Sequence, residues 1–311
     1  MAKIISVWNN KGGVGKTTLS FHLAQGLALT GHYVLLIDND PQNCLTRVYC
    51  GVKPEEVGVC QIFKGEIDLK DAILPLKDIQ INNENTLGLV PANGEYGNFL
   101  AKDKMHLLNP DNFVRGIRDP EIHDTFDYII IDNPPAFEGT TRVMLEESDE
   151  IIVPCIPDKV AMIGLMNTFA YLGKMGPKHV AKVKKIIPTI VKNTNHHKKQ
   201  EAVMRALFPE FVTESIVVDT ATVQDTIDAR KIVYLYKYTS KYAQNMLQLI
   251  AECFPEVRLD MSRDKIQNVK NVKKIENFME AMRRRRETAE SMKLIQEHTV
   301  LRLPETSEVK A

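Results

Sequence analysis

Short apolar runs and longer amphipathic segments alternate along this chain. The apolar runs are Ile4 to Trp8, Tyr33 to Ile37, Leu87 to Val90, Tyr128 to Ile131, Ile151 to Ile156 and Ile186 to Val191, with a shorter candidate at Ile216 to Val218. Such runs are typical of strands in a parallel sheet that helices cover on both faces. Lys16 to Leu29 is predicted to form a helix that ends near Gly31, because glycine readily adopts the left-handed conformation that follows a helix. The pattern therefore predicts an α/β fold, a doubly wound and mostly parallel sheet flanked by helices.

The character of the sequence changes after Pro255. Residues 261–311 hold 12 Lys or Arg, 8 Asp or Glu, one aromatic residue and no strand-like run. We therefore predict two parts, one domain at 1–255 and a mostly helical, basic extension at 256–311. The apolar residues of the extension lie close to one helical face, which we expect to pack on the body of the protein or on a second subunit. They are Ile266, Val269, Val272, Ile275, Met279 and Met282.

Composition excludes several classes of protein. The 311 residues include 40 Lys or Arg and 40 Asp or Glu, and 44% are hydrophobic, which argues against a disordered chain, a collagen or a disulfide-rich miniprotein. No stretch of ~18 apolar residues could span a membrane, and the first residues lack the pattern of a signal peptide. The five cysteines are odd in number and form no Cys-x-x-Cys pair, so we expect free thiols and a cytoplasmic protein.

A glycine-rich segment stands between the first predicted strand and the first predicted helix, where a phosphate-binding loop must lie. Its sequence is Asn10-Lys11-Gly12-Gly13-Val14-Gly15-Lys16-Thr17-Thr18. Glycines allow successive backbone N–H groups to point at phosphate oxygens, and the helix N-terminus adds its partial positive charge. The ammonium group of Lys16 would reach the β- and γ-phosphates, and the Thr17 hydroxyl would ligate Mg²⁺.

Carboxylates follow two further strands. Asp38 and Asp40 stand in the segment Asp38-Asn39-Asp40-Pro41-Gln42, and Asp132 ends the run Tyr128 to Ile131. Ligands of open parallel sheets bind beyond the carboxyl ends of the strands, so these side chains are expected to lie near the loop. Asp132 would hold Mg²⁺, through water.

The loop resembles the deviant Walker A motif, Lys-Gly-Gly-x-Gly-Lys-Thr, of the ParA/MinD family of ATPases. The resemblance extends over about residues 1–255, since Asp38 to Gln42 is similar to the first switch of that family and Asn133-Pro134-Pro135 to the second. It implies that ATP and Mg²⁺ are the cofactors, that residues 11 to 18 bind the nucleotide, and that Lys11 reaches across a dimer to phosphates bound by the partner. Lys11, Lys16 and Asp40 would then serve hydrolysis, with Asp40 positioning the attacking water. Thr17, Asp38 and Asp132 would serve the metal, and Asn193 would contact adenine.

The chain departs from the family pattern in places. Asn133 replaces the more usual Thr or Cys of the second switch, and Asp219 stands where some members have an arginine of the DNA-binding face. A DNA-binding face would thus need other residues. Residues 159–200 contain no acid and nine lysines, a local excess that fits sequence-independent phosphate contact but also a solvated face. The candidate DNA contacts are Lys182, Lys184, Lys185, Lys198 and Lys199, and Arg283, Arg284 and Arg285 of the extension.

Two functions from this family compete. The first is a ParA-type partition ATPase, which forms a homodimer around ATP, binds DNA non-specifically and is released by hydrolysis that a centromere-binding, ParB-like partner stimulates. The alternative is a MinD-like positioning ATPase that cycles on the membrane. The end of the chain, residues 301–311, is short, carries Glu305 and Glu308 and is broken by Pro304, which makes it a poor membrane helix. An iron–sulfur carrier would need paired ligand cysteines, which are absent from the sequence. A scaffold that binds ATP and barely hydrolyses it remains compatible with the pattern.

Overall fold

The computed structural model describes residues 1–53, 57–76, 86–92, 108–137, 139–229, 231–237 and 239–257. The predicted helical extension, apart from Glu256 and Val257, lies outside these residues. The same holds for Arg283, Arg284 and Arg285, so their predicted role stays a prediction.

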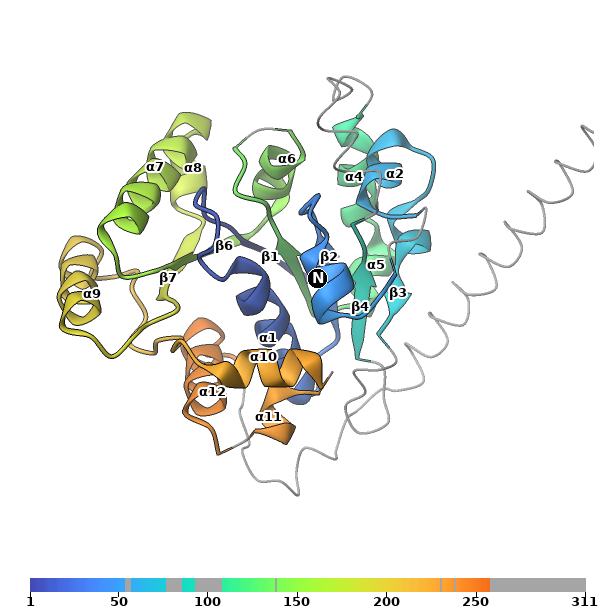
Figure 1. The fold of residues 1–311 in the computed structure, drawn as a ribbon. Coiled ribbons are helices and arrows are strands. Elements are labelled where there is room, and N and C mark those ends of the chain that lie inside the picture. The colour runs from blue at the N-terminus through green and yellow to red at the C-terminus, as the bar shows by residue number, and fades with distance from the viewer. Residues whose placement is uncertain are drawn as a thin grey trace, which may run out of the picture.

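A seven-stranded sheet forms the centre of the described structure (Figure 1). Its strands are β1 (Lys3–Val7), β2 (Val34–Asp38), β3 (Leu74–Pro75), β4 (Leu87–Val90), β5 (Tyr128–Asp132), β6 (Glu150–Cys155) and β7 (Val183–Pro188). Their spatial order is β3-β4-β2-β5-β1-β6-β7, and every pairing is parallel except that of β3 with β4. The sequence-based fold class is confirmed. The two-residue β3 was not predicted, because it is too short to leave a pattern.

Helices cover both faces of the sheet (Figure 1). They are α1 (Lys16–Leu29), α2 (Val59–Lys64), α4 (Pro110–Ile117), α5 (Pro120–Thr125), α6 (Thr140–Glu147), α7 (Lys159–Met175), α8 (Pro177–Val180), α9 (Asn195–Leu207), α10 (Ala221–Asp228), α11 (Val233–Tyr236) and α12 (Lys241–Cys253), with shorter helical turns η1 (Leu45–Tyr49) and η2 (Leu69–Ala72).

Successive strand residues are buried on opposite faces. In β5, Ile130 packs in the core beneath α1 and α12, whereas Ile129 and Ile131 pack in the core beneath α2 and α4. Because both faces are covered, a strand needs apolar residues at every position, which explains the uninterrupted apolar runs of the sequence. The same arrangement leaves the carboxyl ends of the strands as the place where polar groups can gather.

Helix α1 begins and ends at the predicted residues. It spans Lys16–Leu29, and Gly31 follows its C-cap with a φ of 88°. The prediction for Ile216 to Val218 was wrong in form, since this segment makes only an isolated bridge, between Val218 and Val191. β7 also starts and ends three residues earlier than predicted. None of the helices in the described ranges is both long and apolar enough to cross a membrane.

Candidate functional site

The glycine-rich loop and the two acidic segments meet at one edge of the sheet. β5 lies between β1 and β2, and Asp132 pairs in register with Val7 on one side and Asp38 on the other. Since the loop follows β1, the three strand ends carry the loop, Asp38 and Asp132 side by side. The predicted juxtaposition is therefore present in the fold.

The backbone of the loop is held from outside. The Asn9 side chain donates to the carbonyl of Pro154 at 2.8 Å and accepts from the N–H of Lys11 at 3.0 Å. On the other side, the Thr189 hydroxyl donates to the carbonyl of Val14 at 2.7 Å. The loop is thus anchored by the side chains of Asn9, two residues after β1, and of Thr189, the residue that follows β7.

The open side of the loop is suited to an anion. A Cβ atom added to Gly12 or Gly13 would meet nothing within 4 Å, so this part of the backbone faces free space. Gly15, with a φ of 86°, is the N-cap of α1 and makes no side-chain cap, which leaves the first N–H groups of the helix available. Such groups, together with the helix dipole, favour phosphate.

Lys16 is buried at the base of the loop. Its side chain is only 7% exposed, and its Nζ donates to the carbonyl of Lys11 at 3.1 Å. Burial lowers the pKa of Lys16, and the nearby carboxylates of Asp132 and Asp40 oppose this effect. A poorly hydrated ammonium beside an anion-binding loop is well placed to gain from a phosphate ligand.

Lys11 points away from its own loop. Its Nζ lies 3.6 Å from Oδ1 of Asp158, the N-cap residue of α7, and its Cβ would lie 3.2 Å from a Cβ built on Gly164 of the same helix. Lys11 and Lys16 are therefore directed to different places, which their spacing in the sequence does not reveal.

The two oxygens of the Asp132 carboxylate differ in their hydrogen bonding. Its Oδ1 accepts from the Ser20 hydroxyl at 3.1 Å, whereas Oδ2 is buried and accepts no well-formed hydrogen bond within the described part of the chain. Burial raises the pKa of Asp132 to about 8, the charge of Asp38 adds to this, and the nearby Thr17 hydroxyl opposes it. A carboxylate oxygen and a hydroxyl facing a phosphate loop form a donor set that fits Mg²⁺. Within the described ranges no three acidic, His or Cys side chains gather to hold an ion, so phosphate and water would supply most ligands.

Both oxygens of the Asp38 carboxylate accept hydrogen bonds from residues of this chain. Its Oδ1 accepts from the N–H of Asp40 at 3.1 Å, and its Oδ2 accepts from the N–H and the hydroxyl of Thr46 at 2.9 and 2.6 Å. Burial raises the pKa of Asp38 to about 7, against the effect of these hydrogen bonds. This geometry favours support of the 38–46 segment over direct metal ligation. Asp40 is half-buried, and its Oδ1 accepts from the N–H of Gln42 at 2.9 Å.

A pocket of about 280 Å³ continues from the loop. That is near the lower end of small-ligand pockets, ~300–1,000 Å³, and suits the nucleoside part of a nucleotide whose phosphates lie on the open loop. Its walls come from the start of α1, from η1, from the residues after β7, from segment 217–220, from α10 and from α12. The lining residues are Gly15, Thr18, Leu19, Tyr49, Thr189, Ile190, Val217, Val218, Asp219, Thr220, Val223, Gln224, Ile227 and Tyr242.

Sequence analysis missed most of this pocket. Asn193, the predicted adenine contact, is exposed and does not line it, whereas Ile190 does, with a φ of 51° that is unusual for a β-branched residue. Asp219, which stands where some family members have an arginine of the DNA-binding face, lies on the pocket wall and 3.6 Å from the Nζ of Lys192. The signal in the sequence was the apolar pair Val217-Val218 after a polar turn, which only the fold brings next to the loop.

The lysines of residues 159–200 do not form one face. Nζ of Lys182 donates to the carbonyls of Leu145 and Glu146, and Nζ of Lys184 pairs with Glu150 at 2.7 Å, both at the start of β7. Lys185, on the same strand, is half-buried. These lysines lie at the amino end of β7. Because β7 is parallel to β6, and β6 is parallel to β1, that end is opposite to the carboxyl end of β1, where the phosphate loop begins. Lys198 and Lys199, by contrast, are exposed on α9, which follows the carboxyl end of β7.

A phosphate-binding loop between β1 and α1 of a parallel sheet, with an acidic residue ending a neighbouring strand, defines a phosphate-loop nucleotide-binding protein. Residues 2–185 match the family model described as an AAA domain. With its Lys-Gly-Gly-x-Gly-Lys-Thr loop and its relatives, the chain belongs to the ParA/MinD family of ATPases.

Relatives of known sequence cover different parts of the chain. The chromosome partitioning protein ParA of Caulobacter vibrioides is 27% identical over 266 residues, which are 82% of this chain and 95% of that protein. The sporulation initiation inhibitor protein Soj of Bacillus subtilis is 35% identical over 179 residues, 56% of this chain and 67% of Soj. An uncharacterised protein of Pseudomonas putida is 36% identical over 172 residues, 54% of this chain. This chain spans only 61% of the length of that relative.

Solved structures share the fold. McdA of Cyanothece without nucleotide superimposes with a TM-score of 0.67 at 19% identity, over 82% of this chain and 100% of McdA. A plasmid partition protein of Borrelia burgdorferi bound to AMPPNP gives a TM-score of 0.62 at 23% identity, over 81% of this chain and 99% of that protein. At these identities the likeness concerns the fold alone.

Proposed function

We propose that this protein is a ParA-type ATPase that closes as a homodimer around ATP and Mg²⁺, binds DNA without sequence preference in that state, and is released by hydrolysis. A centromere-binding, ParB-like partner would stimulate the hydrolysis. The relatives named above support a partition or positioning role, and the loop, the pocket and Asp132 support ATP as the ligand.

The observation that carries the proposal is the direction of Lys11. In the single chain its ammonium faces Asp158 at the start of α7 and not its own phosphate loop. A phosphate on the loop of a second copy, facing this one, would be a stronger partner for that ammonium than a half-exposed carboxylate. This supports the role that the family resemblance gives to Lys11.

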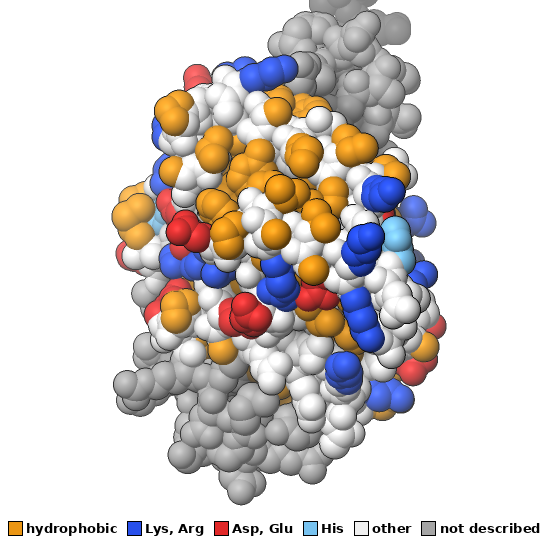
Figure 2. Space-filling view, turned by 90° about the vertical axis from the view of Figure 1, so that its left-hand side faces the viewer, with side chains coloured by type: hydrophobic (Ala, Val, Ile, Leu, Met, Phe, Trp, Pro, Cys, Tyr) orange, Lys and Arg blue, Asp and Glu red, His pale blue; other side chains and the backbone are white. Residues whose placement is uncertain are grey.

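An apolar surface next to Lys11 supports the same arrangement. Val160, Ile163 and Met166 lie on one face of α7 and are 64%, 60% and 50% exposed. Figure 2 shows apolar side chains gathered on the side of the molecule that α7 and α9 form, with Lys or Arg side chains at its margin. A contiguous apolar surface of this kind marks an interaction site, and its position beside the loop suits a second copy.

The residues of the site divide the work of hydrolysis. The loop N–H groups and Lys16 would bind the β- and γ-phosphates, and Thr17 and Asp132 would hold the metal. Mg²⁺, when bound, would neutralise charge that develops on the phosphate oxygens. Asp40, half-buried two residues after β2, would orient the attacking water. Asp38 would hold the Asp40 segment in place through its bonds to Asp40 and Thr46.

The test combines sedimentation and DNA titration of an Asp40→Ala variant. With ATP and Mg²⁺ we expect a dimer that binds random-sequence DNA, and with ADP or no nucleotide a monomer that does not. A monomer at saturating ATP would refute the dimer. An ATP dimer that binds anionic vesicles instead of DNA would select the MinD-like alternative.

A further inference from the structure

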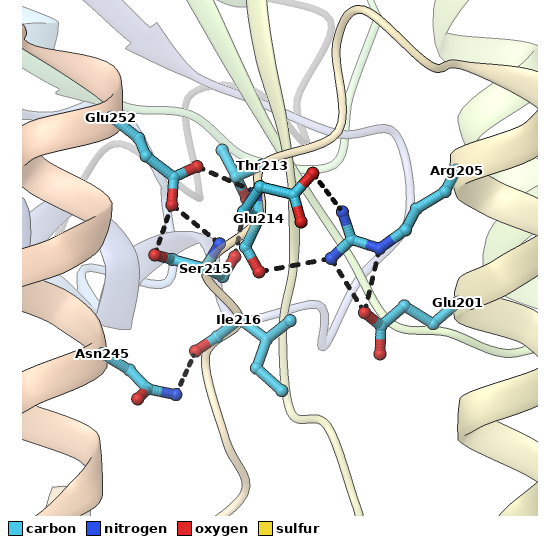
Figure 3. A network of polar contacts seen from close by, with 8 residues as sticks. All are labelled: Glu201, Arg205, Thr213, Glu214, Ser215, Ile216, Asn245 and Glu252. Atoms are coloured by element: carbon cyan, nitrogen blue, oxygen red, sulfur yellow. Dashed lines mark hydrogen bonds and ion pairs between the residues drawn. The ribbon is translucent and has the colours of Figure 1, made fainter.

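One wall of the pocket is fixed by a carboxylate that does not itself line it. Glu252, on α12, accepts hydrogen bonds from the N–H groups of Glu214 and Ser215 at 2.9 and 2.8 Å, and a third from the Ser215 hydroxyl (Figure 3). Three donors of one turn therefore converge on one carboxylate. Glu252 is absent from the residues that surround the pocket.

Two more side chains hold the same turn. From α12, Nδ2 of Asn245 donates to the carbonyl of Ile216 at 2.9 Å. From α9, on the opposite side in Figure 3, the Arg205 guanidinium donates to the carbonyl of Glu214 at 3.3 Å and lies 3.7 Å from its carboxylate. Side chains of two helices, α12 and α9, therefore hold the turn 214–216 in place.

The turn leads directly into the pocket wall. After Ile216 the chain passes alongside the end of β7, where the N–H of Val217 donates to the carbonyl of Pro188 at 2.8 Å and the N–H of Asp219 donates to Val191 at 3.1 Å. These bonds do not build a regular strand, and residues 217 to 220 then line the pocket. A third bond, from the N–H of Val191 to the carbonyl of Val217 at 3.0 Å, also attaches the wall to the segment after β7, and the turn 214–216 sets where the chain enters the wall.

We propose that Glu252 is a positioning residue that sets the wall of the nucleoside pocket. The inference rests on the proposed function, because it takes the pocket to hold the base and sugar of ATP. A carboxylate suits the role, since it only accepts hydrogen bonds and two of the three donors are backbone N–H groups that cannot turn away. An amide in its place would present an NH₂ group to one of those donors and release part of the turn.

The test compares Glu252→Gln with the wild type by calorimetric titration of two ligands, ATP and inorganic tripolyphosphate. The phosphate loop is held by Asn9 and Thr189, which the substitution does not touch. Without one charge-assisted hydrogen bond, the wall is in its binding position in a smaller fraction of the molecules, and the apparent affinity falls with that fraction. We therefore expect ATP affinity to fall about tenfold and tripolyphosphate affinity to stay within about twofold.

Glu256→Gln is the matched control, because Glu256 lies shortly after α12 and pairs with Lys3, away from the pocket. It should leave both affinities unchanged. An unchanged ATP affinity in Glu252→Gln, or an equal loss for both ligands, would overturn the inference and leave the proposed function standing. If the wild type bound neither ligand, the proposed function would fall, and the inference with it.

Discussion

Nδ2 of Asn39 donates a hydrogen bond to Oδ1 of Asn133 at 2.9 Å, and so joins the segments that follow β2 and β5. Both side chains are fully buried. Nδ2 of Asn133 in turn donates to the Ser6 hydroxyl of β1 at 3.1 Å. A Thr or Cys carries one polar side-chain atom, whereas Asn133 offers a separate oxygen and nitrogen to the two partners. The departure from the family pattern is therefore a structural link between the two switch segments.

Breaking this link should cost stability in a non-additive way. We expect Asn39→Ala and Asn133→Ala each to lower the free energy of unfolding by about 1–3 kcal/mol, since each removes one side of a buried amide–amide hydrogen bond. The double variant should lose clearly less than the sum. Urea unfolding of the four proteins measures the coupling, and strict additivity would show that the contact contributes nothing.

Replacing Lys16 should weaken ATP binding without lowering the stability of the protein. Lys16→Ala removes the ammonium at the base of the loop, so ATP affinity should fall by about 100-fold or more. Because burial lowers the pKa of Lys16, its charge is costly in the empty site, and the melting temperature without ATP should not fall. Calorimetric titration and thermal unfolding measure the two effects, with Lys174→Ala, on the exposed side of α7, as control. Retained ATP affinity would remove Lys16 from the phosphate site.

The apolar face of α7 should matter only for association. Ile163→Glu places a charge in the centre of that face, so the ATP-bound Asp40→Ala dimer should dissociate at least about tenfold more readily, because the carboxylate would be buried without a partner. Leu235→Glu changes a comparably exposed residue on α11 and should leave the dimer intact. Sedimentation at several protein concentrations gives the dissociation constants. A dimer insensitive to Ile163→Glu would place the interface elsewhere.

The two groups of lysines should behave differently toward DNA. Lys198→Gln with Lys199→Gln removes two exposed charges, so affinity for random DNA should fall and the salt slope should drop by about two. Lys184→Gln should instead lower stability, because it leaves Glu150 without its closest cation, and should leave the slope unchanged. Anisotropy titrations at several salt concentrations distinguish these outcomes. A slope unaffected by the double change would exclude α9 from the DNA face.

Buried His22 predicts a pH dependence of stability. Burial lowers the pKa of His22 to about 3, from 6.5 in the unfolded chain, and its Nδ1 lies 2.6 Å from the Tyr242 hydroxyl. Below pH ~6.5 His22 therefore binds a proton in the unfolded chain but stays neutral in the native state. The free energy of unfolding falls by up to ~1.4 kcal/mol per pH unit as the pH drops.

His22→Gln should remove this contribution, so that its stability relative to the wild type rises as the pH falls from 6.5 to 4.5. Denaturant unfolding at several pH values measures the difference, and His32→Gln, at a half-exposed position, serves as the control. Parallel pH profiles of stability for the wild type and His22→Gln would show that His22 does not cause the loss of stability at low pH.

The sequence predicted correctly those features that depend on residues close together in the chain. The apolar runs identified strands of a sheet buried on both faces, and the pattern from Lys16 to Leu29, with Gly31 after it, predicted the bounds of α1. The glycine-rich segment was correctly placed between β1 and α1. Asp38 and Asp132 could be placed near the loop because carboxyl ends of parallel strands share an edge. Each of these inferences needs only neighbours in the chain and one general rule of sheet topology.

Only the tertiary structure decided which distant side chains meet. It turned Lys11 toward Asp158, placed Asp219 on a pocket wall and paired Lys184 with Glu150. It also brought Glu252 into hydrogen-bond distance of the turn before Val217. Each of these contacts joins residues from separate elements. Their meeting depends on strand order and helix packing, which the local periodicity of the chain does not encode.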